Sequence, residues 1–102
     1  MVLKVSKFGK NLRLLMSQCG YVRAHGSGGL PAQAGEEAFV QRIQGTPYPR
    51  FHLYVQEREE EWIFKLHLDQ KRPSYVGVRA HSGEHDGPAV EREMQRIREI
   101  VI

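Results

Sequence analysis

The sequence contains a single cysteine, Cys19, and no long hydrophobic run, and both shortages exclude classes of protein. One cysteine cannot form an internal disulfide, which argues against a disulfide-stabilised secreted domain and favours a reducing compartment. No apolar stretch approaches the roughly 18 residues that a transmembrane helix needs. The first ten residues, MVLKVSKFGK, lack the apolar segment and cleavage site of a signal peptide. We therefore expect a cytoplasmic protein that has no membrane partner.

Acidic residues are missing from the first quarter of the chain. Residues 1–25 contain five of the fifteen lysines and arginines and none of the twelve acids, so the net charge of +3 comes entirely from this quarter. A local basic excess indicates an anionic partner such as nucleic acid. Five such charges are also common on a solvated helix face, so the two interpretations remain open.

The composition, with 40% hydrophobic and 26% charged residues, is typical of one globular domain covering residues 1–102. A first helix is expected from about Lys7 to Cys19, with Ser6 as its N-cap and Gly20 at its end. Its apolar residues recur with the period of one buried helical face: Phe8, Leu12, Leu15, Met16 and Cys19. A final helix is expected from Pro88, with Val90, Met94, Ile97 and Val101 buried.

Strands are expected between the helices. Residues 36–43 fit a strand or a short helix, and their length favours the strand. Residues 50–56 and 62–69 are expected to be half-buried strands, because Phe51, Leu53 and Val55 in the first and Phe64, Leu66 and Leu68 in the second alternate with polar side chains. The segments 23–35 and 70–87 are expected to be loops.

The alternating strands predict a register, because their apolar residues must share a face. Pairing Val55 with Phe64, Leu53 with Leu66 and Phe51 with Leu68 meets this demand, and then three polar pairs lie on the other face: His52–His67, Arg50–Asp69 and Tyr54–Lys65. The predicted fold class is α+β, an antiparallel three-stranded sheet with helices on one face in the order α-β-β-β-α. The polar face, with its two histidines, is expected to be open.

One interpretation of the polar face is a metal site. Imidazole and carboxylate ligands suit zinc, manganese or iron, and His67 and Asp69 lie two residues apart on one strand face. The segment HSGEHD adds His81 and His85 at a spacing seen in zinc sites. The candidate metal ligands are therefore His67, Asp69, His81 and His85.

A second interpretation is a face that binds, and perhaps cleaves, RNA. A neutral histidine serves as a general base towards a ribose hydroxyl and a protonated one as a general acid, which are roles for His52 and His67. Basic side chains contact phosphates and an aromatic ring stacks on bases, and the candidates for these contacts are Lys10, Arg13, Arg50, Lys65, Lys71, Arg72 and Tyr75.

Three segments, KFGKNLRLLMSQCGY, RFHLYV and FKLHL, followed by a closing helix, resemble the HicA-type toxins of bacterial toxin–antitoxin pairs. The resemblance implies a double-stranded-RNA-binding-domain-like fold, an mRNA endonuclease activity and an antitoxin partner. It places the catalytic histidine at His52, although Arg50 and Phe51 stand here where the family has Gly-Ser.

A third interpretation involves no chemistry. Histidines are tolerated on open sheet faces, Asp69 can form a turn after its strand, and the chain would then be a protein-interaction module that uses an exposed strand edge.

Overall fold

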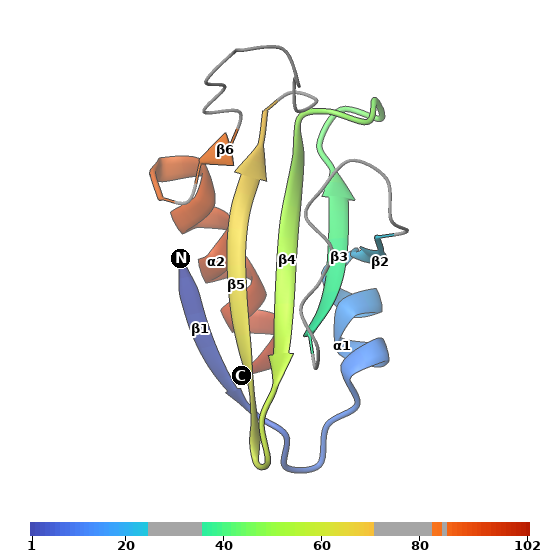
Figure 1. Ribbon diagram of the computed structural model, residues 1–102, viewed down its shortest axis with the longest axis vertical. Coiled ribbons are helices and arrows are strands. Elements are labelled where there is room, and N and C mark those ends of the chain that lie inside the picture. Colours follow the sequence, from blue (N-terminus) through green and yellow to red (C-terminus); the bar gives the residue numbers. More distant parts are fainter. Residues whose placement is uncertain (25–35, 71–82, 85) are drawn as a thin grey trace.

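The computed structural model describes residues 1–24, 36–70, 83–84 and 86–102 (Figure 1). In chain order its elements are β1 (Val2–Ser6), α1 (Leu12–Cys19), β2 (Val22–Arg23), β3 (Glu36–Arg42), β4 (Arg50–Glu57), β5 (Glu61–Asp69), β6 (Gly83–Glu84) and α2 (Pro88–Val101). No helix within the described ranges is long and apolar enough to cross a membrane.

The described strands form one antiparallel sheet in the order β1-β5-β4-β3-β2, and β6 pairs with the end of β5. The prediction of an α+β fold is confirmed, as is the strand at 36–43. The predicted number of strands, three in the order α-β-β-β-α, was too low. β1 precedes the first helix, and β2 and β6 extend the sheet. Of the three strands that the prediction missed, β2 and β6 have two residues each, too few to show a period of two in the sequence.

The N-terminal segment differs most from its prediction. Val2–Ser6 is a strand, so Ser6 ends β1 and caps no helix. The helix N-cap is Asn11, whose side-chain oxygen accepts a hydrogen bond from the Leu14 backbone amide at 3.1 Å. Phe8, expected on the buried stripe, lies in the connection between them and is 92% exposed. The apolar spacing begins at Phe8, before the true start of the helix, and the cap at Asn11 determines where the helix begins.

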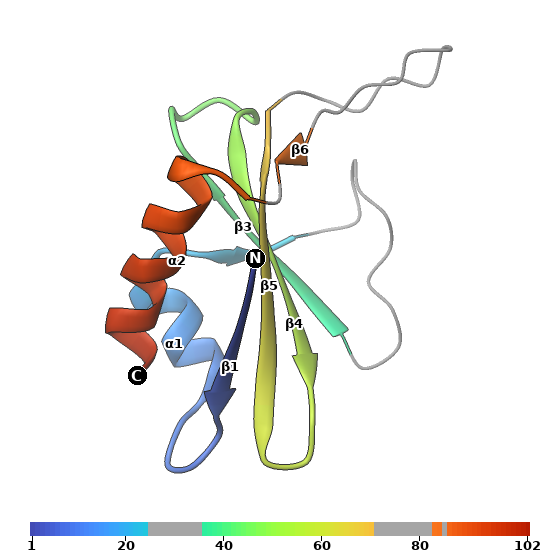
Figure 2. The ribbon, with the colours of Figure 1, turned by 90° about the vertical axis from the view of Figure 1, so that its left-hand side faces the viewer.

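Both helices cover the same face of the sheet, as expected (Figure 2). The predicted stripe of α2 is confirmed, since Val90, Met94, Ile97 and Val101 are all buried. The core forms between the buried sides of the two helices and the apolar face of β4 and β5. In that face, Leu53, Val55, Phe64 and Leu66 are at most 2% exposed. Among the residues that the structure describes, no helix lies over the other face of β4 and β5.

A buried polar network connects the helices to the sheet on the covered face. The Tyr21 hydroxyl donates a hydrogen bond to Glu93 Oε2 at 2.7 Å, and Arg96 donates to both carboxylate oxygens of Glu93 at 2.8 and 2.7 Å. Arg96 also donates to the Cys19 carbonyl oxygen at 2.7 Å, to which Gln41 donates at 3.3 Å. The network therefore fixes the end of α1 against α2 and β3.

Gly20 follows α1 in the left-handed conformation with a φ of 83°, which few residues other than glycine adopt at low cost. A Cβ atom there would lie 2.7 Å from Gln41 Nε2, so a larger residue would also displace the end of the Gln41 side chain, which donates to the Cys19 carbonyl oxygen.

Burial is the largest cause of the pKa shifts of two groups in this network, Tyr21 and Cys19. It raises the pKa of the Tyr21 hydroxyl far above its ordinary value, and the hydrogen bond to Glu93 raises that pKa further. Burial also raises the pKa of the Cys19 thiol. The hydrogen bond to Glu93 raises the pKa of Arg96.

Candidate functional site

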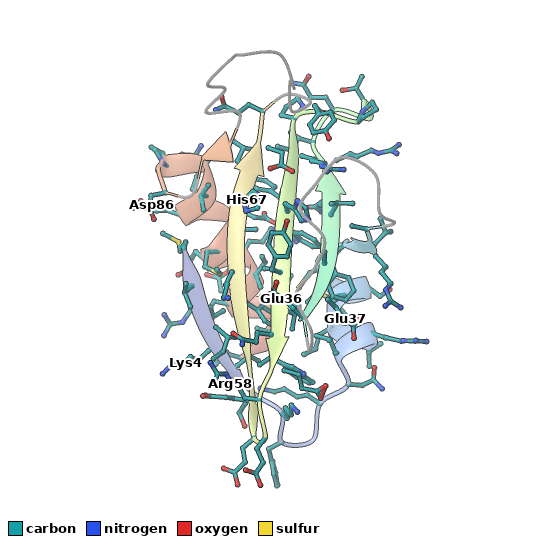
Figure 3. All side chains as sticks on the ribbon, in the orientation of Figure 1. Lys4, Glu36, Glu37, Arg58, His67 and Asp86 are labelled. Atoms are coloured by element: carbon teal, nitrogen blue, oxygen red, sulfur yellow. The ribbon has the colours of Figure 1, made fainter. Side chains whose placement is uncertain are left out.

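The candidate site lies on the uncovered face of β4 and β5. The two strands pair in the predicted register, with His52 opposite His67, Arg50 opposite Asp69 and Tyr54 opposite Lys65. Because the sheet alternates side chains between faces, the register that buries the apolar residues also places these six together on the other side. Figure 3 labels His67 on β5, on this face of the sheet.

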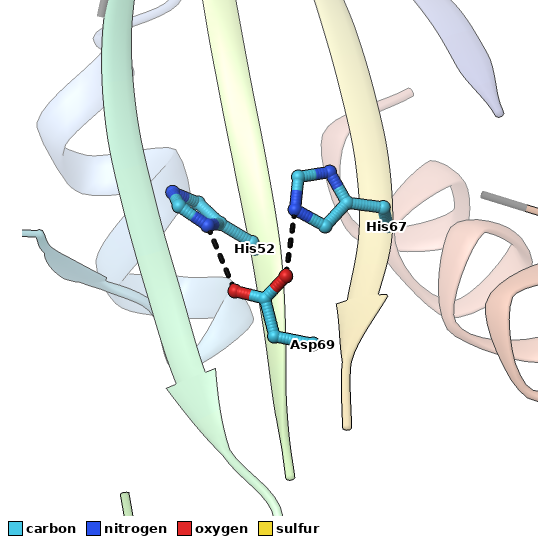
Figure 4. A group of neighbouring side chains, drawn as sticks. All are labelled: His52, His67 and Asp69. Carbon is cyan, nitrogen blue, oxygen red and sulfur yellow. Dashed lines mark hydrogen bonds and ion pairs between the residues drawn. The ribbon is translucent and has the colours of Figure 1, made fainter. Parts of the chain in front are cut away.

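A carboxylate bridges the two histidines (Figure 4). His52 Nδ1 lies 3.0 Å from Asp69 Oδ2, and His67 Nε2 lies 2.9 Å from Asp69 Oδ1. The two imidazole rings are 5.0 Å apart between centroids. A potential ligand atom from each of the three side chains lies within 4.8 Å of the other two.

The Asp69 carboxylate is ionised. Its burial alone would raise its pKa, but the hydrogen bonds from His52 and His67, together with their charges, hold the pKa of Asp69 well below its usual range. An ionised carboxylate only accepts hydrogen bonds, so the ring nitrogens that face it carry the protons.

One ring nitrogen of His52 is buried and makes no hydrogen bond with the described residues. His52 is 4% exposed, and its Nε2 atom has no hydrogen-bond partner in the part of the chain that the structure describes. The Tyr54 ring stacks on the His52 ring with centroids 4.4 Å apart. Burial raises the pKa of Tyr54, and the charges of Asp69 and Glu36 raise it further. A buried polar atom left without a partner is rare in native proteins and needs an explanation.

Arg50 completes the site at the start of β4. Its Nε atom donates to Asp69 Oδ2 at 3.2 Å, the same oxygen that faces His52. Its guanidinium carbon lies 4.7 Å from the centroid of the Tyr48 ring, a stacking contact that fixes its orientation. Tyr48 was not a candidate in the sequence, because it precedes Pro49 in a turn and follows no strand period.

The structure only partly assembles the residues expected to bind RNA. Arg50 lies in the site, whereas Lys65 forms an ion pair with Glu36 at 3.3 Å. Lys10 precedes the N-cap of α1 and Arg13 lies in its first turn, and α1 packs on the opposite face of the sheet. The structure therefore does not place Lys10 and Arg13 beside the histidine face, and their role in RNA binding stays a prediction. The remaining three candidates lie outside the described residues: Lys71, Arg72 and Tyr75.

The structure also divides the predicted set of metal ligands. His67 and Asp69 come together as expected, while His81 and His85 lie outside the described residues. The third potential ligand is His52, which the sequence analysis proposed together with His67 as a catalytic histidine. The predicted register was the signal that could have added it to this set, because it already placed His52 opposite His67.

No protein-family model matches the chain, and neither a curated protein nor a solved structure gave a match to it.

Proposed function

We propose that this protein binds a divalent transition-metal ion through His52, His67 and Asp69. The observation that carries the proposal is the convergence of three donor groups, two imidazoles and one carboxylate, within 4.8 Å on two paired strands. Two histidines and one carboxylate are a donor set that zinc and iron both accept.

The positions of the donor atoms support this function. His52 Nδ1 and His67 Nε2 both point at the Asp69 carboxylate, from opposite sides of it. An ion between the three groups would take the place of the two protons that they now share. Small shifts of the side chains would bring each donor to the 2.0–2.2 Å that zinc prefers.

The burial of the ligands supports a site that keeps open positions. The side chains of His67 and Asp69 are 15% and 18% exposed, whereas the His52 side chain is only 5% exposed. Three protein ligands leave at least one coordination position for water or substrate, the arrangement of catalytic rather than structural zinc sites. A bound ion there would lower the pKa of its water towards neutrality and make it a nucleophile. The reaction class that fits is metal-dependent hydrolysis.

Metal binding is tested directly on the full chain. Protein purified without chelator is expected to contain close to one equivalent of metal, and cobalt(II) should give the visible absorption spectrum of a four- or five-coordinate site. Replacing a ligand by His52→Ala, His67→Ala or Asp69→Asn should weaken the affinity at least about 100-fold, more than the loss of a supporting residue usually does.

Glu36→Gln is the matched control, because Glu36 offers a carboxylate on neighbouring β3 and is not in the ligand group. Its metal affinity is expected to equal that of the wild type. Protein without stoichiometric metal, or ligand variants that bind metal as tightly as Glu36→Gln, would rule out the site.

RNA cleavage without metal is a second candidate, favoured by the contact between the two imidazoles. His52 and His67 would then exchange the roles of base and acid, and two such histidines are the arrangement that this chemistry needs. Cleavage that persists in excess EDTA, and that His52→Ala abolishes together with any growth arrest on expression, would favour this candidate over the metal site.

A further inference from the structure

We propose that the ligand of this metal site is an oxyanion, and that Arg50 is the residue that binds it together with the ion. This inference rests on the proposed metal site and names the class of substrate that the site accepts. Phosphate and carboxylate groups share the chemistry, since both offer negatively charged oxygens to a metal and to a guanidinium.

Arg50 is held in place with its terminal nitrogens unused. Its Nε atom is committed to Asp69 Oδ2 and its plane stacks near the Tyr48 ring. Among the described residues, no hydrogen bond involves its two Nη atoms, although the side chain is only 12% exposed. A guanidinium fixed on one edge presents its other donors in a rigid fork, which matches the oxygens of phosphate or carboxylate.

The distance from Arg50 to the ion is set by a shared partner. Asp69 Oδ2 accepts from Arg50 Nε and also faces His52 Nδ1, so an ion bound by Asp69 would lie one carboxylate away from the guanidinium. An oxyanion coordinated to that ion can therefore reach Arg50 with a second oxygen. The ion and the arginine would hold the same group from two sides.

The charges of the site require an anion. A divalent ion beside Arg50, offset by the single negative charge of Asp69 and two neutral imidazoles, leaves two positive charges in a largely buried place. Uncompensated charge is costly to bury. The neighbouring Glu36 does not offset it, because its charge is paired with Lys65 at 3.3 Å. An anionic ligand supplies the missing negative charge.

The experiment titrates inorganic phosphate and acetate into cobalt(II)-loaded protein and follows the visible spectrum together with the heat of binding. We expect at least one of the two anions to bind the loaded protein and to change the cobalt spectrum, and the metal-free protein to bind it at least about tenfold more weakly. The tighter of the two identifies the substrate group as a phosphate or a carboxylate.

Arg50 is tested at saturating metal, so that any effect of the substitution on metal affinity is removed. Arg50→Gln is expected to weaken the bound anion at least about tenfold, the loss typical of a charge-assisted hydrogen bond. Arg50→Lys should fall between Arg50→Gln and the wild type. Arg42→Gln is the matched control, because Arg42 lies directly across from Arg50 on β3 and is exposed. It should bind the anion as the wild type does.

Each result is decisive once circular dichroism shows that the variants are folded. Metal-loaded protein that binds neither anion would overturn the proposal, as would equal anion binding by Arg50→Gln and Arg42→Gln. Failure to bind metal at all is a different result, because it removes the metal site itself.

Discussion

Two clusters of polar side chains lie on opposite faces of the same sheet, and they differ in how completely they are paired. On the covered face, Glu93 receives hydrogen bonds from Tyr21 and on both oxygens from Arg96, and the Cys19 carbonyl oxygen accepts two more. On the open face, Asp69 is equally well satisfied, but the His52 ring that it contacts keeps a buried nitrogen for which the described residues offer no hydrogen-bond partner.

The difference separates a structural network from a binding site. A buried network whose members are all satisfied stabilises the arrangement of the elements around it. An arrangement with an unsatisfied buried group costs stability, and proteins tend to keep such costs where function requires them. The covered cluster is thus expected to control folding, and the open cluster to control ligand binding.

The largest effect on stability is expected from Glu93→Ala. The substitution leaves the buried Tyr21 hydroxyl without its acceptor and removes the partner of Arg96, so the free energy of unfolding should fall by about 2–3 kcal/mol. Urea denaturation of metal-free protein measures the change. Glu99→Ala, an exposed position on the same helix, should change stability by less than about 0.5 kcal/mol. Equal effects of the two would show that the covered network is not a structural centre.

A smaller effect on the stability of the folded protein is expected at alkaline pH. The pKa of Tyr21 is higher in the folded protein than in the unfolded chain, so its contribution to stability is complete below about pH 10 and is lost as the pH rises above it. The unfolded state then releases a proton that the folded state retains, at a cost of up to about 1.4 kcal/mol per pH unit.

The test compares the slope of stability against pH between about pH 10 and 11 in the wild type and in Tyr21→Phe. Cys19 and Tyr54, whose pKa values burial also raises, are present in both proteins and contribute equally. The slope should be shallower in Tyr21→Phe. Parallel slopes would contradict the role assigned to the buried hydroxyl.

The smallest effect on stability is expected from His52→Leu, and its sign is the informative part. The substitution removes the unsatisfied Nε2 atom from a buried position, while Asp69 keeps its contacts with His67 and Arg50. The metal-free protein should therefore be unchanged or more stable by up to about 1 kcal/mol, although it has lost a metal ligand. A loss of more than about 2 kcal/mol would place His52 among the structural residues and erase the contrast between the faces.

The central hairpin could be predicted from the sequence because apolar and polar residues alternate along both strands. This alternation allows one register that places Phe51, Leu53 and Val55 on the same face as Phe64, Leu66 and Leu68, and the structure has that register. The meeting of His52 and His67 followed from it without further assumptions. The helix α2 was equally predictable, since Pro88 marks its start and its apolar stripe is unbroken.

Other features depended on information that a local pattern does not contain. The true start of α1 is decided by the cap at Asn11, against an apolar spacing that extends to Phe8. The bridging role of Asp69 depends on side-chain conformation, because its position opposite Arg50 does not say that it turns towards both histidines. The separation of Lys10 and Arg13 from the histidine face follows from the expected packing of both helices on the other face, and their role in RNA binding stays a prediction.

The short distance along the chain between the proposed ligands has a consequence for how the site arises. His52, His67 and Asp69 all belong to one hairpin whose strands join through a turn of three residues, Arg58 to Glu60. The donor set is therefore complete once two neighbouring strands have paired, before any contact between distant parts of the chain is needed. A designer could copy this donor set by placing three side chains on one face of another antiparallel hairpin.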